Sequence, residues 1–141
     1  MADEREVRRV VGILEDFTAD LIRQIGTEIT AELIERTPVD TGWARANWIP
    51  SVTVPVDFEQ AVIESREDRV ASTPASRSTQ DSAIAQLASG YDFGDGSIFI
   101  SNNVPYITIL NGGSSTQAPE GFVQIAIEQG IRNVVTPRQP R

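Results

Sequence analysis

The fold is decided by one stretch of sequence, T-P-V-D-T-G-W-A-R-A-N-W at residues 37–48. It ends a long helical pattern, because Pro38 disfavours a helical conformation at Thr37. Asp40-Thr41-Gly42 is a turn signal, since Asp bonds nearby backbone amides and Gly tolerates positive φ. The alternation that follows, from about residue 45 to 54, predicts a strand. The stretch is therefore predicted to be an elbow between a helix and a sheet.

The helical pattern before the elbow covers residues 4–36. Its apolar residues are spaced mostly by three and four, which is the helical period. They are Val7, Val10, Val11, Leu14, Phe17, Leu21, Ile22, Ile25, Ile29, Leu33 and Ile34. One such helix would be about 50 Å long, more than a compact domain of 141 residues needs to cover its own core. Part of it is expected to face a neighbouring subunit; the alternative is a break near Gly26, with both pieces packed inside the monomer.

The sequence after the elbow predicts several shorter elements. In chain order they are a loop over 55–78, a short helix over 79–89, a strand over 97–101, a strand or single helical turn over 106–110, a helix from near Pro119 to about 135, and a loose basic tail over 136–141. The fold class is thus α+β in a single domain, 1–141. It combines a long N-terminal helix, a small and mostly antiparallel sheet, a short middle helix and a C-terminal helix.

Composition excludes several kinds of chemistry. The formal net charge is −8, and the sequence has no histidine, cysteine or lysine. Without them there is no Ser-His or Cys-His nucleophile, no thiolate or imidazole metal site, and no Schiff-base or phosphate-loop lysine. The acidic balance disfavours general nucleic-acid binding. We expect a non-enzymatic protein without cofactor or metal.

Nothing in the sequence predicts a membrane segment or a signal peptide. No apolar run approaches the ~20 residues that span a bilayer. The first residues, Met1-Ala2-Asp3-Glu4-Arg5-Glu6, are charged. We expect a soluble chain that is intracellular or belongs to a particle assembled inside a cell.

Three short motifs suggest other chemistry. Asp40-Thr41-Gly42 matches the aspartic-protease tripeptide, which needs a second aspartate that a homodimer could supply. Those proteases place the tripeptide after a strand in an all-β fold, whereas a long helix precedes it here. Asp92-Phe93-Gly94 matches the kinase magnesium tripeptide, but no glycine loop or lysine accompanies it. Asn111-Gly112-Gly113 before a helix could bind an anion, although Glu120 would oppose a phosphate there.

Two separated segments together are more specific than any of these motifs. The first is 37–42 followed by Arg45 and Trp48. The second runs from Asn102-Asn103-Val104-Pro105-Tyr106-Ile107 through Leu110-Asn111-Gly112-Gly113-Ser114 to Gln117-Ala118-Pro119-Glu120-Gly121-Phe122-Val123. They resemble, in order and spacing, the signature of a family of tailed-phage minor tail components called neck, head–tail joining or tail-completion proteins. The resemblance covers about residues 5–54 and 79–135. The family often has Glu at position 111, Met at 122 and Leu at 44, where this sequence has Asn, Phe and Ala.

The resemblance implies a structural virion protein at the head–tail joint, assembled in the host cytoplasm. Such subunits form a ring, usually sixfold, between stopper or portal-side connector proteins and the tail terminator or tail tube. Genome DNA passes through the lumen without specific binding. A tail terminator or another head–tail adaptor is the alternative position, and a homodimeric aspartic protease is a remote one. The candidate elbow and interface residues are Pro38, Asp40, Thr41, Gly42, Arg45, Trp48, Pro105, Tyr106, Gly113, Ser114, Gln117, Pro119 and Gly121.

Overall fold

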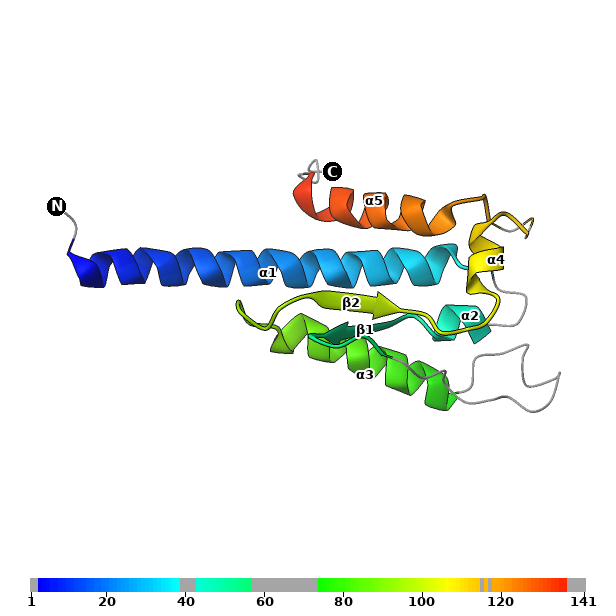
Figure 1. The fold of residues 1–141 in the computed structure, drawn as a ribbon, viewed down its shortest axis with the longest axis horizontal. Coiled ribbons are helices and arrows are strands. Elements are labelled where there is room, and N and C mark those ends of the chain that lie inside the picture. The colour runs from blue at the N-terminus through cyan, green and yellow to red at the C-terminus, as the bar shows by residue number, and fades with distance from the viewer. Residues whose placement is uncertain (1–2, 39–42, 57–73, 115, 117, 137–141) are drawn as a thin grey trace, which may run out of the picture.

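The computed structural model describes residues 3–38, 43–56, 74–114, 116 and 118–136. Its elements in chain order are α1 (Glu4–Arg36), α2 (Trp43–Ala46), β1 (Ile49–Val52), α3 (Pro74–Gly90), β2 (Ile98–Ser101), α4 (Ile107–Asn111) and α5 (Phe122–Val135). Helix α1 is the middle layer, with α5 on one side and the β1–β2 sheet and α3 on the other (Figure 1). The predicted α+β class, with a long first helix and a closing helix packed against it, is confirmed.

Helix α1 has the predicted bounds and no break. Its first turn is capped by Asp3, whose Oδ1 accepts a 2.9 Å hydrogen bond from the Glu6 amide. The alternative of a break at Gly26 is wrong, because Gly26 lies buried within the continuous helix. A Cβ at Gly26 would stand only 3.1 Å from Leu87 Cδ2 of α3, so the missing side chain allows α3 to approach closely.

The sheet has two antiparallel strands, with Ile49 opposite Ser101 and Val52 opposite Ile98. The predicted strand over 97–101 is confirmed as β2, but the strand over 45–54 is too long at both ends. At its start, residues 43–46 form the helical turn α2, which suits the high helix propensity of alanine. At its end, Thr53 has φ of 72°, which turns the backbone out of the extended region.

The later helices differ from prediction mainly at their starts. Helix α3 begins at Pro74 rather than near 79, since proline suits a first helical turn; the loop therefore did not extend to 78. The α4 segment is helical, which resolves the choice between strand and helix. Helix α5 begins at Phe122 rather than near Pro119. The rest of the predicted loop, 57–73, and the tail after 136 lie outside the described residues.

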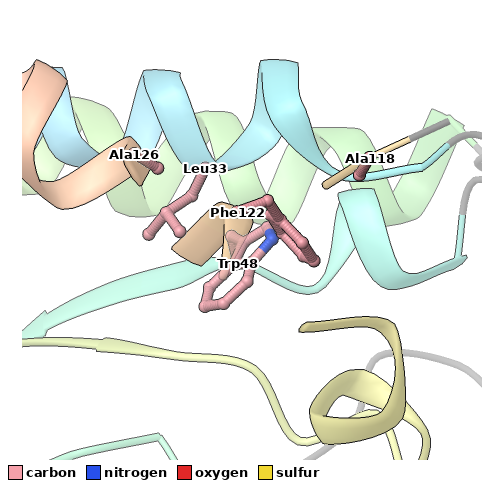
Figure 2. Packing of buried hydrophobic residues seen from close by; sticks show 5 residues of the cluster. All are labelled: Leu33, Trp48, Ala118, Phe122 and Ala126. Atoms are coloured by element: carbon pink, nitrogen blue, oxygen red, sulfur yellow. The ribbon is translucent and has the colours of Figure 1, made fainter. Parts of the chain in front are cut away.

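Two apolar clusters form the core. The larger joins the last turns of α1 to α5 and to the start of the sheet, through Leu33, Trp48, Ala118, Phe122 and Ala126 (Figure 2). The smaller joins α1 to α3 through Ala19, Leu87 and Tyr91. Both clusters lie along α1 from Ala19 onward, so the first half of the helix contributes little to the core.

Candidate functional site

The C-terminal end of α1 is tied to the β1 strand by a buried hydrogen-bonded pair, Thr37 and Trp48. The Thr37 hydroxyl donates to the Leu33 carbonyl at 2.5 Å and accepts from Trp48 Nε1 at 2.7 Å. Both side chains are buried, so an indole N–H without this partner would be left unpaired away from water. The pair therefore fixes the direction in which the chain leaves the helix.

Arg45 of α2 binds backbone carbonyls at the same helix end. Its Nη2 donates to the carbonyls of Glu35 and Thr37, both at 3.1 Å. Carbonyls of the last helical turn lack intrahelical partners and carry the negative end of the helix dipole, so a guanidinium is a suitable cap. The Arg45 Nε is buried and has no hydrogen-bond partner among the described residues.

Two amide side chains hold the chain between α2 and β1. Gln80 of α3 is buried, and its Nε2 donates to the carbonyls of Arg45 and Trp48 at 2.9 and 3.1 Å. Asn102 Nδ2 donates to the Ala44 carbonyl at 2.8 Å. Sequence reasoning missed both roles, because their partners lie 32 to 58 residues away along the chain. No local pattern marks such contacts.

The second motif block is organised around Asn111, at the end of α4. Its carbonyl accepts from the Gly121 amide at 2.7 Å, and its Oδ1 accepts from the Val123 amide at 3.0 Å. Asn111 thus caps α5 from outside that helix. Gly121 has φ of 75° and precedes the first helical residue, a backbone conformation that favours glycine. This cap explains why α5 begins at Phe122 rather than at Pro119.

The two motif blocks meet at the end of α1. Pro38 and Arg45 of the first block line one small pocket with Pro119 and Phe122 of the second. We call this region the α1-end cluster, defined by Thr37, Pro38, Arg45, Trp48 and Phe122. Its hydrogen bonds bind the backbone and the Thr37 side chain at the end of α1, and its apolar side chains Trp48 and Phe122 pack in the larger core cluster.

The remaining candidates are spread over the surface near α4. Pro105, Gly113, Ser114 and Pro119 are exposed, and Tyr106 is half-buried at the start of α4. Gly113 has φ of 90°, and a Cβ there would stand 3.2 Å from Glu120 Cβ. Asp40, Thr41, Gly42 and Gln117 lie outside the described residues. The proposed turn at Asp40-Thr41-Gly42 and its protease alternative therefore stay predictions.

Asp92-Phe93-Gly94 forms part of a tight turn. The Asp95 amide donates to the Asp92 carbonyl at 3.1 Å, and the Asp92 amide donates to Asp95 Oδ2 at 2.7 Å. Phe93 is exposed and Gly94 has φ of 100°. These contacts give the tripeptide a structural role as a turn between α3 and β2.

The second notable region is the arm, which we define as residues 4–18 of α1. It projects beyond α5, the sheet and α3 (Figure 1). Six large apolar side chains on it are exposed to between 46% and 67%: Val7, Val10, Val11, Ile13, Leu14 and Phe17. Together these side chains form an exposed apolar patch on the described structure.

No protein-family model matches this chain, and neither does any curated protein or solved structure. In the described part of the chain, no group of three or more metal-binding side chains is positioned to hold an ion. Within the same residues, no helix combines the length and apolarity needed to cross a membrane.

Proposed function

We propose that this protein is a structural virion subunit that forms a ring at the head–tail joint of a tailed phage. The observation that carries the proposal is the exposed apolar arm. Its six side chains belong to neither of the two apolar clusters of the described residues, although they continue the helical pattern that packs the rest of α1. A subunit that assembles with copies of itself needs such a surface. On a protein that works as a soluble monomer, the same surface would promote aggregation.

The motif resemblance supports the same function. Its two blocks are separated by more than fifty residues. Both nevertheless contribute side chains to the α1-end cluster and to the apolar cluster of Trp48, Ala118 and Phe122. Residues of the signature therefore have a common structural purpose in this fold. They hold α5 and the sheet against the C-terminal half of α1, and that arrangement leaves the arm free.

The charge of the chain also suits this position. A net charge of −8 disfavours adhesion of DNA, which a passage for the genome requires. The proposed partners are other copies of the chain, the stopper or portal-side connector on one side, and the tail terminator or tail tube on the other.

Two measurements on one protein test the proposal. The mass of the purified chain in solution should correspond to a closed oligomer, and the chain should be a stoichiometric component of purified phage particles. A particle reconstruction would then distinguish a neck ring from a tail terminator or another adaptor. A chain that is monomeric at all concentrations and absent from particles would refute the proposal.

A further inference from the structure

The arm has one continuous apolar face, and this face extends the surface on which α5 packs. At 100° per residue, Val7, Val11 and Leu14 lie on the same side of α1 as Ile25 and Ile29. Ile29 is in direct contact with α5, where Gly130 approaches its backbone. Helix α5 ends before the arm begins, so the same apolar stripe is covered in one half of α1 and uncovered in the other (Figure 1).

The arm's face is also wide. From Ile13 on one edge to Val11 on the other, it covers about 160° of the helix circumference. A two-helix coiled coil needs only a narrow seam, whereas a stripe wider than about 100° is typical of a helix that faces a packed layer. The arm is therefore suited to contact a helix that belongs to a packed domain, rather than an isolated helix of a coiled coil.

Helix α5 carries a second uncovered apolar face. Ile127, Ile131 and Val135 follow one another at intervals of four and are exposed to 38%, 39% and 57%. Residues at this spacing form a straight ridge, and ridges of the same spacing on the arm, such as Val10–Leu14 and Ile13–Phe17, leave a groove between them. Packing of one such ridge into the other groove is the commonest helix contact in globular proteins.

The charges on α5 favour this contact. Between Phe122 and Val135 the sequence has one acidic residue, Glu128, and one basic residue, Arg132. In a chain with a net charge of −8, this helix is a neutral surface on which two copies can meet without strong repulsion. The cores of protein–protein interfaces are usually depleted of charged residues.

The arm cannot reach the α5 ridge of its own chain. Helix α1 is a single continuous helix, and the arm points away from α5 (Figure 1). The two faces are therefore different surfaces, separated on one molecule, and each is exposed among the residues that the structure describes. Two different complementary surfaces give a head-to-tail contact, which closes into a ring when the rotation between copies allows it.

We infer that the arm of one copy packs against the Ile127–Ile131–Val135 ridge of the next copy, and that this head-to-tail contact builds the ring. The inference rests on the proposed function for the closure of the ring, but it names the two surfaces that meet. The partner is a second copy of this chain, and the contact is between unlike surfaces.

Cysteine cross-linking tests this contact directly, because the natural chain contains no cysteine. Leu14→Cys and Ile131→Cys place one thiol on each face at exposed positions. The two single variants are purified separately, mixed, and treated with a short bis-maleimide cross-linker. We expect a two-chain product in the mixture and little product from either variant alone. The double variant should give a ladder of products that stops at the number of subunits in the ring.

Other outcomes would overturn the contact. Strong cross-linking of Leu14→Cys alone would mean that two arms pack against each other, and strong cross-linking of Ile131→Cys alone would mean that two α5 ridges do so. An assembled chain with no cross-link in the mixture would place the interface elsewhere while leaving the ring intact. Cross-links as expected in a protein absent from phage particles would instead contradict the proposed function and leave the contact standing.

A second pair of variants separates assembly from folding. Leu14→Glu should abolish the oligomer in mass measurements while leaving thermal unfolding of the monomer nearly unchanged, since Leu14 is exposed. Asp16→Ser, on the opposite side of the arm, is the control and should assemble as the natural chain does. An oligomer of unchanged mass with Leu14→Glu would refute a role for the arm.

Discussion

Trp48 Nε1 donates a 2.7 Å hydrogen bond to Thr37 Oγ1, and both groups are buried. The bond joins the end of α1 to the start of the sheet between residues eleven positions apart, and the predicted turn motif at 40–42 lies between them in the sequence. The direction of the chain after α1 is thus set by a side-chain contact as well as by Pro38.

Thr37→Val removes the acceptor while keeping the side-chain shape. We expect it to lower the free energy of unfolding by about 1–3 kcal/mol, because the Trp48 N–H is then buried without a partner. Urea denaturation measures the change. Thr27→Val is the matched control: its hydroxyl also donates to a carbonyl four residues earlier, at 2.8 Å, but it is half-buried and the change should be smaller.

Trp48→Phe and the double variant complete a double-mutant cycle. If the hydrogen bond couples the two residues, the double variant should be less destabilised than the sum of the single variants, by roughly 0.5–3 kcal/mol. Additive effects would show that Thr37 and Trp48 contribute to stability independently of each other.

Gly130→Ala is expected to be strongly destabilising. An added Cβ would stand 2.6 Å from Ile29 Cγ1 and 2.7 Å from the Ile29 Cα, so α1 and α5 would have to separate. Overpacking of this kind costs about 1–3 kcal/mol or more, and the midpoint of thermal unfolding should fall accordingly.

Gly12→Ala is the matched control for Gly130. No atom of the described residues lies within 4 Å of a Cβ at position 12, which is also in a helix. The substitution should raise stability by up to about 1 kcal/mol, because alanine favours the helix. Equal effects of the two substitutions would contradict the close α1–α5 packing.

Arg45→Ala removes the cap on the Glu35 and Thr37 carbonyls. We expect a loss of about 1–3 kcal/mol in the free energy of unfolding, since hydrogen bonds from charged donors are the stronger kind. Arg8→Ala is the comparison, as its ion pair with Glu4 is exposed on the arm and should contribute little. Similar losses for both variants would count against the capping role.

Asn111→Ala removes the external cap of α5. The Val123 amide would lose its side-chain acceptor, and we expect a loss of about 0.5–2 kcal/mol. Asn111→Asp keeps an oxygen acceptor and adds a negative charge at the positive end of the helix, so it should retain most of the stability. If both variants unfold alike in urea, the cap is not what stabilises the start of α5.

The sequence by itself determined the elements with strong local signals. The spacing of apolar residues from Val7 to Ile34 predicted α1 to the residue, because an amphipathic helix depends on a repeating pattern within the segment. The strand β2 and the end of α3 were also predicted to within one residue, since turn residues mark these boundaries locally.

Only the tertiary structure decided how those elements meet. The helical turn at 43–46 and the late start of α5 involve hydrogen bonds from outside those elements, made by Gln80 and Asn111 respectively. Local propensity carries no information about such contacts. The stripe along α1 was readable from the sequence, but its division into a covered half and an uncovered arm was not. That division follows from where α5 lies along α1. The close packing of Gly130 of α5 against Ile29 of α1 sets that placement.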